Sequence, residues 1–376
     1  MSTPLLNQPS SPNQQNRTYP EYSQPLWRRL LLTRESAVIV LTLAVIVYSL
    51  VNVQNFDGPL TLKFLLQDIA PILLIALPMT MVIVTGEIDL SVASIVGLSS
   101  VLLGVLHDGG MPIPAAALLA LLVGAVCGAL NGFLIAYVGL PSLAVTIGTL
   151  ALYRGIAVGL LGTTAVTEFT EKWSDLAATG TIGESSIPLI MIPFAVLAVV
   201  FVVLLHFTTF GRGVYDIGLN AEAAHFTGVD VARTKFVLFV LSGVVSAFAG
   251  IYFTLRFGSA RGDNATGLEL QVIAAVLLGG VSIFGGRGRL HGVLAGVVLI
   301  GVIASALRLE GVTVNVTNII IGLLLVASVV STTFVDWVGA KVPRKAAPGS
   351  QHASPDSAAS AASVSSAANT TSTGCA

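Results

Sequence analysis

The stretch that decides the fold is residues 69–86, IAPILLIALPMTMVIVTG, which contains no charged side chain. A helix of this length and apolarity can cross a bilayer, which takes about 17–25 residues. The rest of the chain is similar, since 54% of its 376 residues are hydrophobic and only 10% are charged, against about 25% charged residues in a soluble domain. The composition excludes soluble globular, disordered, nucleic-acid-binding and disulfide-stabilised classes. We therefore expect an all-α integral membrane protein.

The gaps between charged residues locate the membrane spans. Nine charge-free intervals contain at least 17 residues: 36–56, 69–86, 90–107, 109–153, 185–211, 236–255, 270–286, 290–307 and 311–335. The interval 109–153 is long enough for two helices that break at Gly139-Leu140-Pro141, and the second, from about 142 to 161, contains Arg154. About ten transmembrane helices are thus expected. Most of the 18 basic residues lie on the cytoplasmic side if both termini are cytoplasmic, as the positive-inside rule requires.

The ends of the chain differ in composition from its middle. Residues 1–35 are polar and rich in Pro, Asn, Gln and Ser, which predicts a disordered cytoplasmic segment and no cleaved signal peptide. Residues 341–376, rich in Ser, Ala and Thr, predict a disordered cytoplasmic tail. The transmembrane domain is expected at 36–340. Two long loops, about 162–186 outside and 210–235 inside, are candidate docking segments for partners.

Two carboxylates lie between apolar runs in the segment Thr85-Gly86-Glu87-Ile88-Asp89-Leu90-Ser91. Charges at membrane depth are expensive and usually functional. One interpretation is structural, with Ser91 and Asp89 capping the next helix. The other is that Glu87, Asp89 and Ser91 line a path for a transported molecule.

The segment Leu278–Gly288 contains five glycines, which disfavour a continuous helix. We expect a broken helix or a re-entrant turn there, formed around Gly279, Gly280, Gly285 and Gly286, because non-helical backbone at membrane depth must be buried or line a wet cavity. Each half of the chain then contains one interrupted segment, a pattern typical of transporters built from repeats.

Arg154 is the only basic residue inside a predicted span. It costs a few kcal/mol there unless it snorkels or pairs, and Glu87 and Asp89 are the candidate partners. Small residues such as Gly124, Gly128, Gly132 and Gly148 allow close contact between helices.

Several chemical signatures are absent from the sequence. A nucleotide-binding P-loop needs Gly-Lys followed by Ser or Thr, and no lysine here is followed by either. No His/Cys cluster has metal-ligand spacing, and nothing positions a catalytic set. Cys127 and Cys375 are expected to be free thiols. The chain is therefore predicted to be neither an ATPase nor another enzyme and to hold no metal.

The inside loop predicts a short capped helix. Asn220 can cap a helix that begins at Ala221, Glu222 favours its positive end, and Gly228 can end it. Such a helix could fit into a groove of a partner protein.

Glu222-Ala223-Ala224, with Gly228 following, resembles the coupling loop of ABC importer permeases, although the distal Leu-Pro of that motif is replaced by Val240-Leu241. Gly86–Ser91 resembles the Gly-Gly-Ile-Asp-Leu-Ser signature of sugar permeases of the ribose type, with Glu87 in place of glycine. Two further blocks resemble the same subfamily. Leu140-Pro141-Ser142, Thr146–Leu150 and Arg154-Gly155 form one of them, and Leu278–Gly288 forms the other. The resemblance covers about residues 36–335.

This resemblance, to the ribose/rhamnose/autoinducer-2 type of ABC importer permease, implies a type II-like importer architecture in the bacterial inner membrane. The partners implied are an ABC ATPase that binds ATP and Mg, an extracytoplasmic sugar-binding protein, and a second permease, identical or paralogous. The implied coupling residues are Asn220, Glu222, Ala223, Ala224 and Gly228. The residues implied for the path or helix breaks are Glu87, Asp89, Ser91, Arg154, Gly279, Gly280, Gly285 and Gly286.

The substrate is predicted from Glu87 and the run Asp89–Ser99, which look most similar to permeases for rhamnose or autoinducer 2. We expect a monosaccharide importer, with rhamnose favoured and autoinducer 2, ribose or another pentose as alternatives. Two other classes remain open. An ion-coupled secondary transporter would use Glu87 and Asp89 as a cation site, and a membrane scaffold would transport nothing.

Overall fold

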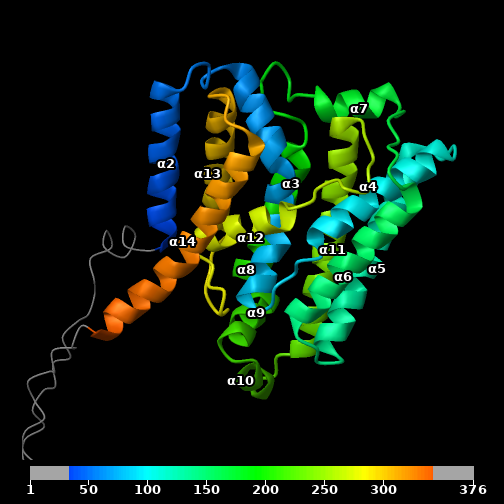
Figure 1. Ribbon diagram of the computed structural model, residues 1–376. Coiled ribbons are helices and arrows are strands. Elements are labelled where there is room, and N and C mark those ends of the chain that lie inside the picture. The colour runs from blue at the N-terminus through cyan, green and yellow to red at the C-terminus, as the bar shows by residue number, and fades with distance from the viewer. Residues whose placement is uncertain (1–33, 342–376) are drawn as a thin grey trace, which may run out of the picture. The chain divides into compact units, whose positions relative to one another are not determined.

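The computed structural model describes residues 34–341, with side chains for residues 35–327, and its regular elements are helices (Figure 1). The predictions for residues 1–33 and 342–376, including a free Cys375, lie outside the described residues. The helices are α2 (Arg34–Asn52), α3 (Pro59–Val84), α4 (Val92–Asp108), α5 (Ile113–Ala136), α6 (Ser142–Leu161), α7 (Glu171–Ala178), α8 (Met191–Phe207), α9 (Thr209–Leu219), α10 (Ala221–Phe226), α11 (Val231–Phe257), α12 (Leu268–Leu278), α13 (Leu290–Leu309) and α14 (Val314–Lys341).

Helix α3 lies in the middle of the bundle and packs against α8, α11, α12 and α13 (Figure 1). From Ile69 to Val84 its residues are apolar on every face except for Thr80, and all of them are buried. A helix that is hydrophobic all round is expected in such a central position. Pro71 and Pro78 lie inside this helix without ending it, as neighbouring helices permit in membrane bundles.

The closest helix pair is α5 with α11, and glycines make it possible. Gly124, Gly128 and Gly132 of α5 each approach the backbone of α11 so closely that a Cβ atom would collide with it or press against it. These three residues therefore have the packing role that their size predicts. Gly148 does not, because nothing lies within 4 Å of the place its Cβ would take.

Each predicted apolar interval contains a helix, and 109–153 contains parts of two. Six helices of the described chain are long and apolar enough to cross a membrane: α2, α3, α5, α6, α11 and α13. A seventh span results if α8 and α9, bent by 67°, are counted together. Helices α4 and α12 and residues 314–327 of α14 are apolar but shorter, so the count of ten spans stays a prediction.

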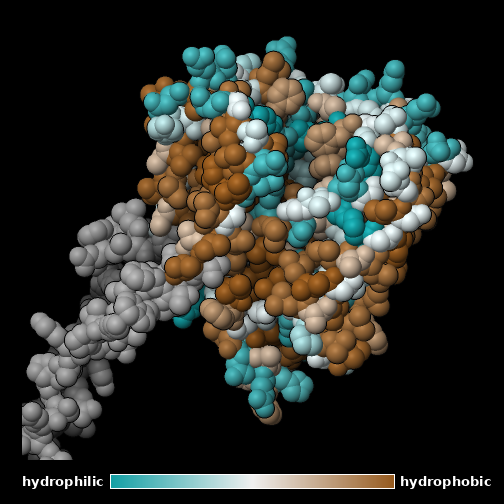
Figure 2. Space-filling view, in the orientation of Figure 1, coloured by the Kyte–Doolittle hydropathy of each residue, from teal (hydrophilic) through white to brown (hydrophobic). Residues whose placement is uncertain are grey.

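Figure 2 shows hydrophobic residues over the sides of the molecule and hydrophilic residues gathered at two ends. One end carries α7 and the other carries α10, as Figure 1 shows. This distribution fits a molecule with an apolar girdle between two aqueous faces. We call these faces the α7 end and the α10 end.

Candidate functional site

The α10 end is built around the short helix α10. The side chain of Asn220 caps this helix, because its Oδ1 accepts a hydrogen bond of 2.9 Å from the backbone N–H of Ala223. Glu222 lies exposed in the first turn, where a negative charge favours the helix dipole. Ala224 is buried against the bundle, so one face of α10 is anchored and the other is open.

Gly228 ends this segment, with a φ of +90° that favours glycine. The N–H of Val229 then donates to the carbonyl of Ala224 over 3.1 Å, which closes the turn. Phe226, on the same segment, is 82% exposed.

A glycine-rich loop, residues 279–289, lies beside α9 at the same end. Helix α12 stops at Leu278 and α13 begins at Leu290, so the chain is interrupted where the glycines indicate. The N–H of Gly286 donates to the carbonyl of Val84 at the end of α3, over 2.8 Å. Gly285 and Gly286 have φ of +83° and +70°, and they leave space for the carbonyl of Gly218 and for the side chain of Leu219 respectively.

The other two glycines predicted at this break have separate roles. Gly279 follows the last residue of α12 and lies against the backbone of Val293 on α13, where a Cβ atom would collide. Gly280 has a φ of +90° and turns the chain away from the helix. Phe284, at the tip of the loop, is 82% exposed. The α10 end therefore presents exposed aromatic side chains from two segments that are distant in sequence.

Glu87 pairs with Lys235 rather than with Arg154. The Nζ of Lys235, in the first turns of α11, lies 2.5 Å from Oε1 of Glu87, and both side chains are mostly buried. The ion pair connects the break between α3 and α4 to the start of α11. Removing one member of such a mostly buried pair would leave the other charge without a partner, which destabilises the fold.

Asp89 lies at the centre of a buried polar network. Its Oδ1 accepts hydrogen bonds from the N–H (3.0 Å) and the hydroxyl (2.6 Å) of Ser91, and its Oδ2 accepts one from the hydroxyl of Ser242 on α11 (2.8 Å). Ser91 in turn accepts a hydrogen bond from Nδ2 of Asn131 on α5. The hydroxyl of Tyr153 on α6 donates to the carbonyl of Cys127 on α5 over 2.9 Å, and Oδ1 of Asn131 lies further from it, at 3.4 Å. This carboxylate, 1% exposed, is thus bonded directly to the start of α4 and to α11, and through Ser91 to α5.

This geometry corrects the expected capping role of Ser91. The Ser91 side chain makes no capping bond to α4, although Ser91 occupies the N-cap position. Its hydroxyl is used between Asp89 and Asn131 instead. The structural role of the segment is therefore to join helices rather than to end one.

Arg154 also differs from the expectation that Glu87 or Asp89 pairs with it. Its guanidinium donates to three backbone carbonyls, those of Gly262 (2.8 Å), Asn264 (2.7 Å) and Ala93 (3.1 Å). Neither carboxylate pairs with Arg154, because Lys235 takes Glu87 and the hydroxyls of Ser91 and Ser242 bond to Asp89. The forked donor is satisfied by carbonyls, as buried arginines require.

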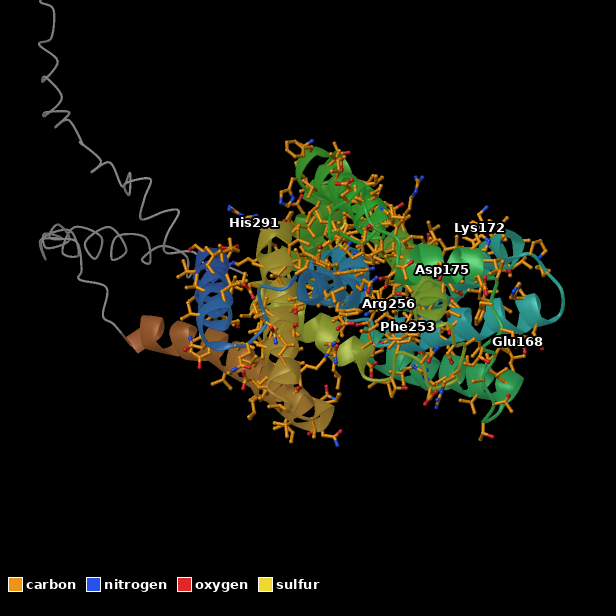
Figure 3. All side chains as sticks on the ribbon, turned by 90° about the horizontal axis from the view of Figure 1, so that it is seen from above. Glu168, Lys172, Asp175, Phe253, Arg256 and His291 are labelled. Carbon is orange, nitrogen blue, oxygen red and sulfur yellow. The ribbon has the colours of Figure 1, made fainter. Side chains whose placement is uncertain are left out.

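The α7 end contains a polar cavity of about 800 Å³ that sequence reasoning did not find. Asp68 on α3 pairs there with Arg256 of α11 and with Arg308 of α13, the latter at 2.6 Å. Figure 3, seen from this end, shows Arg256 and Phe253 near the middle of the molecule and Glu168, Lys172 and Asp175 towards one side. The only signal in the sequence was Asp68 itself, a carboxylate at the edge of an apolar stretch.

The loop between α11 and α12 forms one wall of this cavity. Arg261 and Asp263 are joined by two hydrogen bonds of 2.9 and 3.0 Å, and this contact lowers the pKa of the Asp263 carboxyl. Asn264 donates to the hydroxyl of Ser100 and holds the loop to α4. Within residues 34–341, no group of three or more His, Cys, Asp or Glu side chains could hold a metal ion.

Residues 61–329 match the protein family described as "Branched-chain amino acid transport system / permease component". Curated relatives include three proteins named autoinducer 2 import system permease protein LsrD. The one from Photorhabdus temperata is 35% identical over 298 residues, which cover 78% of this chain and 88% of the relative. The one from Salmonella typhimurium is 35% identical over 310 residues (81% and 92%), and the one from Yersinia enterocolitica is 37% identical over 297 residues (77% and 88%). No solved structure matches.

The chain therefore belongs to this permease-component family, and the predicted resemblance to ABC importer permeases is confirmed. It is a multi-pass membrane protein and a transport subunit. The preference for rhamnose finds no support among these relatives.

Proposed function

We propose that this chain is the permease subunit of an ATP-driven importer whose cargo is autoinducer 2 or a small sugar similar to it. The relatives that carry this cargo in their names cover most of the chain, at 35–37% identity. Rhamnose, ribose or another pentose remains a cargo to be compared with it directly. A binding protein on the outer face would deliver the cargo, and a second permease, identical or paralogous, would complete the path.

The observation that carries the proposal is α10. It is a capped helix anchored by buried Ala224, with Glu222 and Phe226 exposed at the polar end of an apolar bundle. We assign it as the element that docks on a separate ATPase subunit, and the ATP and Mg of transport belong to that partner. The α10 end is then cytoplasmic, in agreement with the distribution of basic residues, and the α7 end faces the binding protein.

In this mechanism the permease supplies a passage and a lever. ATP binding closes the ATPase pair and displaces α10, which is continuous through Gly228 and Asp230 with the long helix α11. The two permeases then change between outward-open and inward-open arrangements. Glu87, Asp89 and Ser91 would respond to this motion as parts of the break between α3 and α4. Arg154 of α6 would respond through its bonds to α4 and to the loop after α11.

The test is uptake into proteoliposomes that contain this chain with its partner permease and ATPase, supplied with the binding protein and labelled autoinducer 2, rhamnose or ribose. We expect ATP-dependent uptake of autoinducer 2 in preference to the other two. Uptake of another sugar would reassign the cargo. Uptake driven by an ion gradient without the ATPase would instead favour a secondary transporter.

Coupling is tested separately with Gly228→Pro and Glu222→Arg. Proline cannot adopt the φ of +90° at position 228, so the end of α10 should be lost. Both variants should insert into the membrane normally but stimulate the ATPase less. Gly148→Ala, at an open position, is the matched control, and unchanged stimulation in both variants would place the docking element elsewhere.

A further inference from the structure

A basic cavity of about 670 Å³ opens between α9 and the end of the glycine-rich loop at the α10 end. Its basic side chains are Arg212, Arg287, Arg289, His206 and His291. The only acidic side chain that lines it is Glu35. The cavity is therefore strongly electropositive, with three permanent positive charges and one negative charge.

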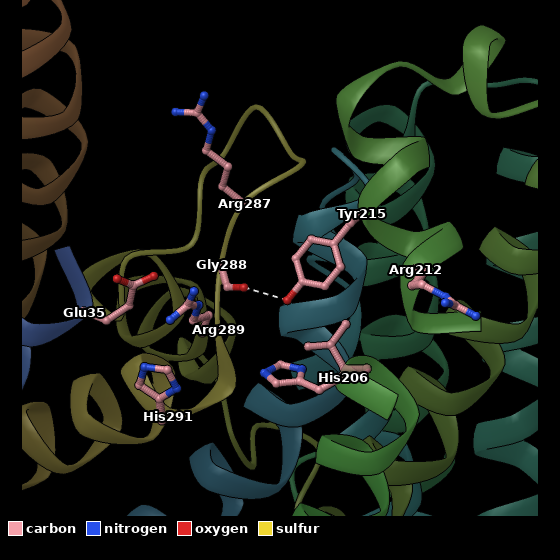
Figure 4. A pocket seen from close by; sticks show the side chains of 9 residues that line it. Glu35, His206, Arg212, Tyr215, Arg287, Gly288, Arg289 and His291 are labelled. Atoms are coloured by element: carbon pink, nitrogen blue, oxygen red, sulfur yellow. Dashed lines mark hydrogen bonds between the residues drawn. The ribbon is translucent and has the colours of Figure 1, made fainter. Parts of the chain in front are cut away.

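The cavity has a fixed framework. The hydroxyl of Tyr215 on α9 donates to the carbonyl of Gly288 over 2.7 Å and joins α9 to the loop that follows α12 (Figure 4). Arg289 and His291 lie on one side of this bond and His206 lies on the other, as Figure 4 shows. Arg289 is close enough to interact electrostatically with both His206 and Tyr215.

Within the part of the chain that the structure describes, these arginines make no direct ion pair. Among the described residues, no carboxylate lies within ion-pair distance of Arg212, Arg287 or Arg289, and all three are exposed. At the α7 end, by contrast, Arg256 and Arg308 both pair with Asp68. Gathering like charges around one cavity is unfavourable unless an anion occupies it, and guanidinium groups match phosphate oxygens particularly well.

The depth of the cavity favours a lipid. Its walls come from the start of α2, the end of α8 and the start of α13, so it lies where apolar helices end and the headgroup layer begins. Directly beside it on α8, Val203 and Phe207 are 46% and 77% exposed and could contact acyl chains. We propose that this cavity binds a phosphate group, and that the headgroup of an anionic phospholipid presents it.

The test uses the full-length chain purified in detergent and measured by native mass spectrometry with dioleoylphosphatidylglycerol, dioleoylphosphatidylcholine or inorganic phosphate. We expect retention of the anionic lipid over the zwitterionic one. The triple variant Arg212→Gln, Arg287→Gln and Arg289→Gln should lose this retention by roughly tenfold or more, because several charge-assisted bonds disappear. Arg233→Gln, an exposed arginine at the same end, is the matched control and should retain it.

The single variant Arg289→Gln, which removes the central guanidinium alone, serves if the triple variant does not fold, as judged by its size-exclusion profile. Arginine-dependent binding of inorganic phosphate without lipid preference would support a phosphate site and identify free phosphate as the source. Equal lipid retention by the wild-type chain and the cavity variants, with no phosphate binding, would overturn the proposal.

Discussion

Replacing Asp89 by alanine tests the role of the buried network most directly. The carboxylate accepts three hydrogen bonds, from the N–H and hydroxyl of Ser91 and from the hydroxyl of Ser242, at a position that is 1% exposed. Alanine leaves these donors without an acceptor in a dry environment. Each orphaned donor costs about 1–3 kcal/mol, so we expect a loss of roughly 3–5 kcal/mol in the free energy of unfolding.

Asparagine at the same position should cost much less, about 1 kcal/mol. Its amide oxygen can keep the bonds from Ser91, and its NH₂ group can donate to the hydroxyl oxygen of Ser242, while a buried charge is removed. The pair Asp89→Ala and Asp89→Asn therefore separates the loss of acceptors from the loss of charge.

The assay is thermal unfolding of the detergent-purified chain, followed by size-exclusion chromatography, with Asp57→Ala as an exposed control. By the usual scaling, Asp89→Ala should lower the midpoint by roughly 5–10 °C and Asp57→Ala by about 1 °C or less. Equal midpoints for the alanine and asparagine variants would refute the reasoning from acceptors. A large loss in both would mean that the charge itself is required.

Three further predictions use the same thermal assay. Lys235→Gln leaves Glu87 unpaired and should lower the free energy of unfolding by about 1 kcal/mol. The charge-swapped variant Glu87→Lys, Lys235→Glu should recover most of this loss. No recovery would mean that the contact is not electrostatic. Arg154→Lys cannot reach carbonyls on both α4 and the loop before α12, so about 2 kcal/mol should be lost, and an unchanged midpoint would contradict the role of those bonds. Gly128→Ala should destabilise the α5–α11 contact, whereas Gly148→Ala should be neutral or stabilising by up to about 1 kcal/mol; the reverse order would contradict the packing.

The positions of the helices could be predicted from the sequence because the signal is local. A charge-free interval is a property of consecutive residues, and each interval does contain a helix. The helix break could be predicted for the same reason, because the five glycines from Gly279 to Gly288 disfavour a helix in their own segment. Asn220 and Gly228 were equally readable as the cap and end of α10, because capping joins residues only a few positions apart.

The partners of the buried charges could not be predicted, because they depend on which helices lie side by side. The pairing of Arg154 with Glu87 or Asp89 was reasonable from charge alone, yet Glu87 pairs with Lys235 and Asp89 accepts its hydrogen bonds from serines. Backbone carbonyls accept the hydrogen bonds of Arg154 instead. Because every residue has a carbonyl, no residue type in the sequence indicates which ones will be used. The cluster around Asp68 and the basic cavity likewise combine residues from three or more helices that are distant in the chain.

Glu87 and Asp89, the two carboxylates between α3 and α4, are both bonded to α11, the helix that follows α10. Glu87 takes its partner from Lys235 and Asp89 takes one from Ser242, and both partners belong to α11. These partners lie seven residues apart, about 10 Å along the helix, and α11 begins five residues after α10 ends. A displacement of α10 that moves α11 as a rigid rod therefore acts on both carboxylates together. Because these carboxylates lie between α3 and α4, such a motion would act directly on the junction of two buried helices.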